Sequence, residues 1–419
     1  MTENIRSILE NEIKMTMGCT DPGAIAFAAA QAAVILEGDL ERIDITLSKN
    51  IYKNAVFVGI PGVKKSGIEY AAILGALVKK PELKLAVLSA VSPELLDEAQ
   101  PYFESIPVKV VYSEMDEPLY ISVTLSNDLC RVTVVIKGDY DWIYHIEKNN
   151  VVVHHNETKG IIEKYACSGL KYKELFDAIV EEPVEDEKLL NYEEINKKAA
   201  MHDISEEALN YIQNIVRLES IPVQELSNLA RLYVLNASRM RMSGERFPIV
   251  SVAGSGNLGI LSMLAVSAVC DALRKEPCER KTALCLSVLT AIYIKSHMKR
   301  LTVMCGTAVA GAAGAAAATA YLLGGGFEEA ENAINTVLGS IGGMLCDGAK
   351  ESCALKVSFA AECGVNSGCM AVDKTGIKTG SGIITDNIDE NIRNIGIINN
   401  LGMKEADDIM LEILSAQKK

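Results

Sequence analysis

The chain has 419 residues, enough for two or three domains, and 49% of them are hydrophobic, which excludes an intrinsically disordered chain. Its net charge of −14 argues against nucleic acid or an anionic membrane as the main partner. The N-terminal MTENIRSILENEIK lacks the basic and apolar regions of a secretory signal, so we expect a cytoplasmic protein with reduced thiols. Eleven cysteines in such a chain indicate metal binding or catalysis more than disulfides.

Two long uncharged runs, 247–270 and 301–327, have the length of a membrane span. The first contains Pro248 and Asn257, the second is mostly alanine and glycine, and neither has aromatic belts at both ends. We therefore expect no membrane partner and interpret both runs as buried helices. A membrane carrier is the alternative.

In chain order, the first predicted helix covers residues 3–17, and Gly18 ends it. Thr20 or Asp21 can cap a second, alanine-rich helix that continues to residue 36. Cys19 lies in the turn between the two helices. A helix N-terminus stabilises a thiolate, so this position favours a reactive cysteine, whereas a small residue that only fills the turn is the alternative.

Strand patterns dominate from residue 41 to residue 155. The predicted helices of this region are 67–80 and 93–103. The predicted strands are 42–48, 54–62, 84–91, 106–113, 119–126, 129–138, 142–148 and 151–155.

A connecting segment is expected at 156–180, and almost everything after residue 186 has a helical pattern. The exception is 373–396, predicted as a loop that forms a strand pair or a cap. The fold class is therefore α+β, with a mainly helical catalytic domain (1–40 and 186–419) and an inserted strand-rich domain (41–185). The expected helices are 186–214, 224–241, 257–274, 279–298, 304–323, 327–345, 354–363 and 403–417.

A glycine loop, AGSGNLG, carries Gly254, Gly256 and Gly259 in dinucleotide-binding spacing. The region that follows has a helical pattern and lacks the acidic strand end that a dinucleotide fold requires. Ser255 and Asn257 at the start of a helix could instead bind a small carboxylate. A turn whose glycines allow close packing is the remaining alternative.

Three cysteines, Cys305, Cys346 and Cys353, stand beside glycines or in small-residue surroundings. Cys346 and Cys353 would be separated by about 10 Å on one continuous helix, so a turn at Asp347-Gly348 is needed to bring them together. Three thiolates would leave one position of a metal centre open for catalysis. Zinc is the competing metal, although the chain has no close CxxC pair.

The whole chain resembles the L-cysteine desulfidase family, which is related to the α part of bacterial iron–sulfur L-serine dehydratases. Two positions depart from the family pattern. Leu258 replaces a polar residue, which affects one substrate contact, and Asp21 replaces the more usual glutamate. The motifs that carry the resemblance are GCTDPGAIAFAAA (18–30), NAVFVGIPG (54–62), AGSGNLGI (253–260), MCGTAVAGAAGA (304–315), GGMLCDGAKESCALKV (342–357) and IRNIGIINNLGM (392–403).

The resemblance implies a 4Fe–4S cluster held by Cys305, Cys346 and Cys353, with Cys19 close to the substrate as a base. It implies conversion of L-cysteine and water to pyruvate, ammonia and hydrogen sulfide, with the substrate thiolate on the open iron. Ser255 and Asn257 would hold the carboxylate, and Asn54 and Lys356 are further pocket residues.

Several alternatives stay open from the sequence. The same chemistry could act on L-serine, or a cluster could serve only as a sensor. The large apolar helices are compatible with a homodimer, and Cys363 and Cys369 are expected in the core or a loop.

Overall fold

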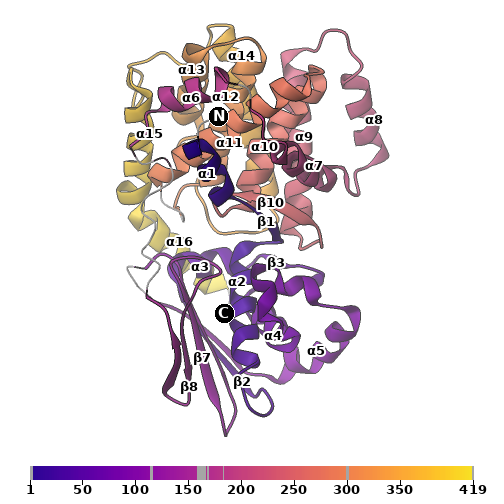
Figure 1. Ribbon diagram of the computed structural model, residues 1–419, viewed down its shortest axis with the longest axis vertical. Coiled ribbons are helices and arrows are strands. Elements are labelled where there is room, and N and C mark those ends of the chain that lie inside the picture. The colour runs from indigo at the N-terminus through magenta and orange to yellow at the C-terminus, as the bar shows by residue number, and fades with distance from the viewer. Residues whose placement is uncertain are drawn as a thin grey trace.

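The computed structural model describes residues 3–113, 117–157, 167, 169–182, 184–298 and 302–417. The chain forms a helical lobe and a lobe built on a β-sheet, stacked along the long axis of the molecule (Figure 1). Each lobe has its own large cluster of buried hydrophobic side chains. This confirms the predicted α+β class.

The sheet lobe contains a six-stranded mixed sheet in the order β5-β2-β6-β7-β8-β9. Among these described strands, only the β2–β5 pair is parallel. Alternate side chains of β2, from Ile43 to Leu47, point into the core, as expected for a strand with one buried face. The strands are β2 (Arg42–Ser48), β5 (Val108–Ser113), β6 (Tyr120–Ser126), β7 (Arg131–Lys137), β8 (Ile143–Lys148) and β9 (Val151–His155).

Helix α2 (Thr20–Ala33) packs directly on β6 and β7. Helix α4 (Ile68–Val78) packs on α2, and α5 (Pro93–Ser105) packs on α4. A Cβ atom at Gly75 of α4 would lie 2.2 Å from the carbonyl oxygen of Ala26. The two helices approach this closely because their facing residues are glycine and alanine.

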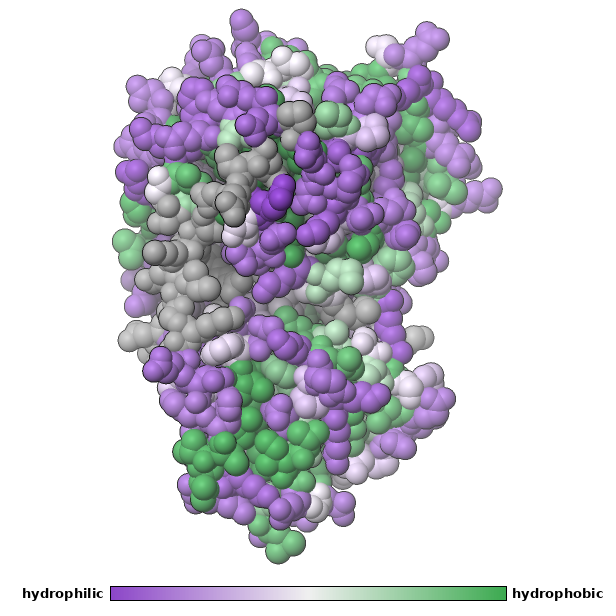
Figure 2. All heavy atoms as spheres, in the orientation of Figure 1, coloured by the Kyte–Doolittle hydropathy of each residue, from purple (hydrophilic) through white to green (hydrophobic). Residues whose placement is uncertain are grey.

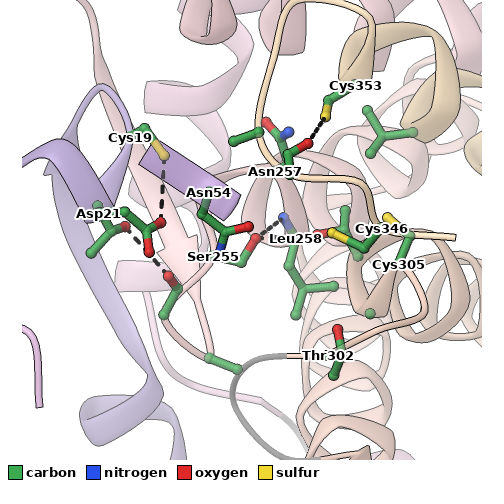
Figure 3. Close-up of a pocket in the computed structure, with 18 of the residues that line it drawn as sticks. Cys19, Asp21, Asn54, Ser255, Asn257, Leu258, Thr302, Cys305, Cys346 and Cys353 are labelled. Carbon is green, nitrogen blue, oxygen red and sulfur yellow. Dashed lines mark hydrogen bonds between the residues drawn. The ribbon is translucent and has the colours of Figure 1, made fainter. Parts of the chain in front are cut away.

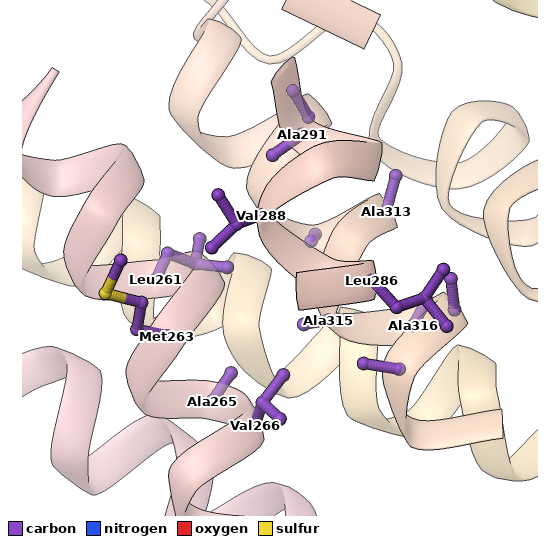
Figure 4. Packing of buried hydrophobic residues seen from close by; sticks show 14 of the residues in the cluster. Leu261, Met263, Ala265, Val266, Leu286, Val288, Ala291, Ala313, Ala315 and Ala316 are labelled. Carbon is purple, nitrogen blue, oxygen red and sulfur yellow. The ribbon is translucent and has the colours of Figure 1, made fainter. Parts of the chain in front are cut away.

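Three buried helices form the centre of the helical lobe: α10 (Gly256–Ala272), α11 (Pro277–Met298) and α12 (Ala312–Leu322). Figure 4 shows the alanines of α12 beside larger side chains of α10 and α11. A Cβ atom at Gly314 would lie 2.2 Å from the carbonyl oxygen of Ser287, so small residues again set the helix spacing. Around this centre lie α1 (Glu3–Glu12), α6 (Tyr172–Val180), α7 (Lys188–Met201), α8 (Glu206–Ile215), α9 (Val223–Met242), α13 (Phe327–Ile341), α14 (Cys353–Val372) and α15 (Ile388–Ile397).

One pair of distant segments lies within the helical lobe, and another joins the two lobes. Strand β1 (Ile13–Met17) pairs antiparallel with β10 (Pro248–Val252) just before the chain enters α2. Helix α16 (Lys404–Gln417) returns from the helical lobe to α3 (Lys49–Ala55) of the sheet lobe (Figure 1). There Lys49 bonds to Asp408 at 2.6 Å, and the buried Lys53 bonds to Asp407.

Several predicted elements of the N-terminal half differ from the structure. The helix predicted at 3–17 ends at residue 12, because residues 13–17 gain a strand partner far along the chain, where Ile13 pairs with Val252. The strand predicted at 84–91 is a tight helical segment, η1 (Pro81–Ala90), since an apolar run of this length fits either state. Residues 54–62 contribute the end of α3 before a two-residue strand, β3 (Gly59–Ile60), which pairs with β4 (Val63–Ser66).

Three predictions after residue 186 also need correction, and one of them is the helix predicted at 354–363, which continues to residue 372 in α14. The helix predicted at 186–214 is divided into α7 and α8, because Ser205 caps a new helix by accepting from the amide of Ala208. The loop predicted at 373–396 contains most of α15, which Asn387 caps in the same way. In both places a capping side chain begins a helix inside a stretch predicted as one element.

The two hydrophobic clusters divide the chain differently from the expected boundaries. Helix α2, expected with the helical domain, packs in the sheet cluster, and α6, expected in the connecting segment, packs in the helical cluster. Helix α2 is apolar on all sides, so its sequence does not indicate which core it joins. Residues 158–166 of the predicted connecting segment lie outside the described residues.

The surface in view is mainly hydrophilic over the helical lobe, and hydrophobic atoms gather over the lower part of the sheet lobe (Figure 2). Among the described residues, no helix has the length and apolar character needed to cross a membrane. The described parts of the two uncharged runs are instead buried in the core, mainly in α10 and α12.

We predict that Gly75→Val lowers the free energy of unfolding by about 1–3 kcal/mol, because the added side chain meets the backbone of Ala26. Urea denaturation measures the change. Gly402→Ala is the control, since its nearest added contact is at 4.0 Å. Equal stability of Gly75→Val and the wild type would contradict the close α2–α4 packing.

Candidate active site

A cavity of about 120 Å³ lies where the two lobes meet. The sheet lobe contributes Cys19, Asn54 and Tyr140, and the helical lobe contributes the glycine loop and the cysteine segments. In Figure 3, Cys19 and Asp21 lie on one side of the cavity, opposite the three other labelled cysteines. All eight predicted site residues line this one cavity: Cys19, Asn54, Ser255, Asn257, Cys305, Cys346, Cys353 and Lys356.

Backbone pairing brings two of those cysteines together. The amide of Cys305 donates to the carbonyl of Met344 at 2.6 Å, and the amide of Cys346 donates to the carbonyl of Val303 at 2.8 Å. Met304 and Leu345 form a short antiparallel bridge between these bonds. Two segments far apart in sequence thereby place their thiols beside each other (Figure 3).

The turn expected at Asp347-Gly348 is present and places Cys353 on the wall of the same cavity as the other two thiols. Gly348 has a φ of +92°, and a Cβ atom there would lie 2.1 Å from the carbonyl oxygen of Lys53. Glycine is therefore required for both the backbone conformation and the close approach. Cys353 begins α14, and its thiol contacts the carbonyl of Gly348 at 3.4 Å.

Lys356 stabilises this turn. Its ammonium donates to the carbonyl of Leu345 at 3.0 Å and pairs with Asp347, which Lys350 also contacts at 2.6 Å. Burial raises the pKa of Asp347, but the hydrogen bonds from Lys350 and Lys356 outweigh it and lower that pKa to about 2. Lys356 lines the cavity, but its ammonium bonds to the cysteine loop.

Burial disfavours the charged forms of two of these thiols. Burial, followed by the neighbouring Cys346, raises the pKa of Cys305 to about 12, and burial also raises the pKa of Cys353. A cationic group bound between the thiolates would remove this penalty. At Cys353 the nearby Lys350 and Lys356 already oppose this rise in pKa.

The donor set is of the kind that an iron–sulfur cluster uses. In the described part of the chain, no three His, Cys, Asp or Glu side chains converge closely enough to hold one metal ion. The three thiols nevertheless face the same cavity. Cluster irons each take their own thiolate, so such ligands need not converge on one point. The other two cysteines of α14, Cys363 and Cys369, do not line the cavity.

Burial disfavours the thiolate expected at Cys19. Cys19 is the residue before α2, as predicted, but its side chain is buried. Burial raises its pKa to about 11, with Arg241 opposing the shift and Asp21 adding to it. At neutral pH Cys19 is therefore a thiol, because loss of solvation outweighs the helix N-terminus.

Asp21 is a candidate functional residue, although in the sequence it is only a possible helix cap. Its Oδ2 lies 3.7 Å from the Cys19 sulfur, and its Oδ1 accepts a hydrogen bond from the Tyr140 hydroxyl at 3.2 Å. Burial raises its pKa to about 6, although Tyr140, Asn54 and Arg241 oppose the shift. A carboxylate that titrates near neutral pH in a cavity is typical of acid–base sites. The signal in the sequence was one acid inside an otherwise uncharged segment.

The glycine loop connects β10 to α10, and each glycine has a separate steric task. Gly254 has a φ of +76° in the turn, and a Cβ atom at Gly259 would lie 2.0 Å from the carbonyl oxygen of Val250. At Gly256 an added Cβ would lie 2.3 Å from Nε of Arg241. The glycines thus make a turn, allow close packing and leave room for a guanidinium. The structure gives no support to the dinucleotide-binding alternative.

The two polar residues of the loop are engaged within the protein. The Ser255 hydroxyl accepts from the amide of Leu258 at 3.3 Å, which caps α10, and lies 3.1 Å from the Thr307 hydroxyl. The Asn257 oxygen accepts from Arg241 at 3.1 Å. Three further residues also line the cavity without any motif in the sequence that points to them: Arg241, Tyr140 and the buried Lys295.

A family model and several relatives in other organisms match most of this chain. The model for the serine dehydratase alpha chain matches residues 85–412. The chain is 36% identical to a UPF0597 protein of Methanocella arvoryzae, with 97% of each chain covered. It is 32% identical to a UPF0597 protein of Clostridium perfringens, over 100% of this chain and 99% of the relative. A UPF0597 protein of Bacteroides fragilis is also 32% identical, over 99% of both chains.

We predict that Asp21 makes stability depend on pH. Between the ordinary carboxyl pKa of about 4 and the native value of about 6, the folded state binds more protons than the unfolded state. The free energy of unfolding therefore falls as the pH rises through this window. Relative to Asp21→Asn, the wild type should lose about 1–3 kcal/mol between pH 4 and pH 7.

Urea denaturation at intervals of pH measures this difference. Asp128→Asn, at an exposed loop position, serves as the control and should follow the wild type. A difference between wild type and Asp21→Asn that stays constant from pH 4 to pH 7 would show that Asp21 has an ordinary pKa.

Proposed function

The chain belongs to the serine dehydratase alpha-chain family, and on this premise we propose that it is an iron–sulfur-dependent L-cysteine desulfidase. The proposed reaction converts L-cysteine and water to pyruvate, ammonia and hydrogen sulfide. The observation that carries the proposal is that three cysteine thiols and a Cys19–Asp21 pair face each other across one cavity. An elimination needs these two kinds of group, one for the leaving sulfur and one for the Cα proton.

Cys305, Cys346 and Cys353 would hold a 4Fe–4S cluster. When bound, the cluster supplies a Lewis-acidic iron for the departing sulfur of the substrate. The chain's own contribution is to fix the three thiols by the Met304–Leu345 bridge and by the Gly348 turn. Lys350 and Lys356 lower the cost of keeping the Cys353 thiolate charged.

The Cys19–Asp21 pair would accept the Cα proton. At neutral pH Asp21 is mainly ionised, since its pKa is about 6, while the Cys19 thiol is protonated. Asp21 is therefore the group that begins as a base, and Cys19 can exchange a proton with it across 3.7 Å. Tyr140 and Asn54 keep the carboxylate in place through hydrogen bonds.

The residues predicted to bind the substrate also line this cavity. Ser255 and Asn257 would shape the end of the cavity that receives the carboxylate, and Asn54 lies beside Asp21 on the opposite lobe. Loss of a proton from Cα and loss of sulfide from Cβ leave aminoacrylate. Water then hydrolyses its imine tautomer to pyruvate and ammonia.

L-serine is the second candidate substrate, because the matching family model is that of a serine dehydratase. Water would then leave in place of hydrogen sulfide, and the acid–base residues would be the same. A cluster that serves only as a sensor is a third possibility, and it predicts a cluster without turnover of either amino acid.

The test uses protein purified without oxygen and reconstituted with iron and sulfide. We expect equal amounts of sulfide and pyruvate from L-cysteine. Cys305→Ala should lose most of its iron and at least about 100-fold in activity, because a ligand is removed. Cys278→Ser is the matched control, since Cys278 is exposed and lies outside the cavity.

Iron analysis and the visible spectrum report the cluster separately from activity. Pyruvate from L-serine alone would identify a dehydratase. A full cluster with no turnover of either amino acid would contradict both lyase proposals, and unchanged iron in Cys305→Ala would contradict the ligand assignment.

A further inference from the structure

Arg241 is a buried cation without an ion pair in the described chain. It lies near the end of α9, its residue is only 5% exposed, and it lines the cavity. One terminal nitrogen donates to the Asn257 oxygen at 3.1 Å and contacts the Met242 sulfur at 3.2 Å. Its Nε is buried and has no hydrogen-bond partner among the described residues. The guanidinium therefore has no anionic acceptor among the described residues, and an anion is what normally offsets its desolvation.

The surroundings are built to hold this guanidinium at the cavity. Gly256 leaves the space, because a Cβ atom there would lie 2.3 Å from Nε and 2.8 Å from the central carbon of the guanidinium. The Asn257 amide accepts from Arg241 through its oxygen and contacts the Met242 sulfur through its nitrogen at 3.3 Å. These contacts orient one edge of the fork and leave Nε without an acceptor in the described part of the protein.

The opposite charge nearby belongs to the acid–base pair. Arg241 lowers the pKa of Cys19 through its charge and a side-chain hydrogen bond, and it lowers the pKa of Asp21 through its charge, so it acts on the same part of the cavity. Asp21 already accepts from Tyr140 and lies by Cys19, and it forms no ion pair with Arg241 within the described residues. The cavity thus contains a cation, Arg241, and an anion, Asp21, that form no ion pair with each other. A zwitterionic ligand such as an amino acid could pair with both.

We propose that Arg241 binds the α-carboxylate of the amino-acid substrate, and that Asn257 and Gly256 position its guanidinium. The inference rests on the proposed function for the identity of the ligand. It changes the role expected for Asn257, which holds the arginine and not the carboxylate. Arginine matches a carboxylate because its planar fork offers two parallel donors.

Binding of a ligand that cannot react tests the proposal. L-alanine carries the carboxylate and amine of the substrate but has no leaving group, and ethylamine is the same molecule without the carboxylate. Calorimetric titration of the anaerobic protein, with and without reconstitution, should show that the wild type prefers L-alanine. Arg241→Gln should weaken L-alanine binding roughly 10- to 100-fold and leave ethylamine unchanged.

Three further variants separate binding from folding. Arg239→Gln lies on the same helix but is exposed, so it should match the wild type. Arg241→Lys keeps the charge and loses the fork, so it should be intermediate. Gly256→Ala keeps the arginine but displaces it, so it should weaken L-alanine binding as well. Thermal unfolding of each variant reports whether the fold is intact.

Three outcomes would overturn the proposal: unchanged L-alanine binding in Arg241→Gln, an equal loss of ethylamine binding, or no preference for L-alanine in the wild type. The proposed function fails separately. If the wild type binds L-alanine through Arg241 but turns over neither L-cysteine nor L-serine, the carboxylate site stands and the lyase does not. If L-cysteine is turned over with an unchanged KM in Arg241→Gln, only the carboxylate assignment fails.

Discussion

Desolvation at the junction of the two lobes governs the properties of the candidate site. Burial is the largest influence on the pKa of Cys19, of Asp21 and of Cys305, and in each case it favours the neutral form. A charge can persist in such a place only if a partner compensates it. A bound cationic group would therefore stabilise the thiolates, and a bound anion would stabilise the Arg241 guanidinium. The Asp21 carboxylate titrates close to neutral pH.

Close packing of small residues is a second constraint on the structure. Glycine and alanine bring α4 against α2 and α12 against α11, so that the two cores are tightly packed. Glycines also allow close approach within the site. Gly256 admits the guanidinium, and Gly348 lets the cysteine turn lie on the backbone of α3. One compositional feature thus serves both the core and the cavity.

Much of this arrangement could be predicted from the sequence, and the remainder depends on distant parts of the chain. The five strands from 106 to 155 follow from local alternation, and the turn between Cys346 and Cys353 follows from Asp347-Gly348. The strand at 13–17 could not be predicted, because its partner lies at 248–252. The role of Arg241 could not be predicted from the sequence. A helix that carries several arginines is expected to be exposed, and only the packing of the folded chain shows which arginine is buried. The protonated Cys19 was missed because burial is a property of the folded lobes and not of its turn.

The division of the site between lobes also affects the order in which the protein matures during synthesis. Most of the sheet core comes from residues 24–146, so it can form while the helical lobe is still being translated. Strand β1 must wait for β10, and α3 receives its ion pairs only when α16 emerges from the ribosome. The cavity walls are therefore completed only after the segments up to Val357 have been synthesised. Any inorganic group that the three thiols bind can therefore be held only once Cys353, the last of them, has been synthesised.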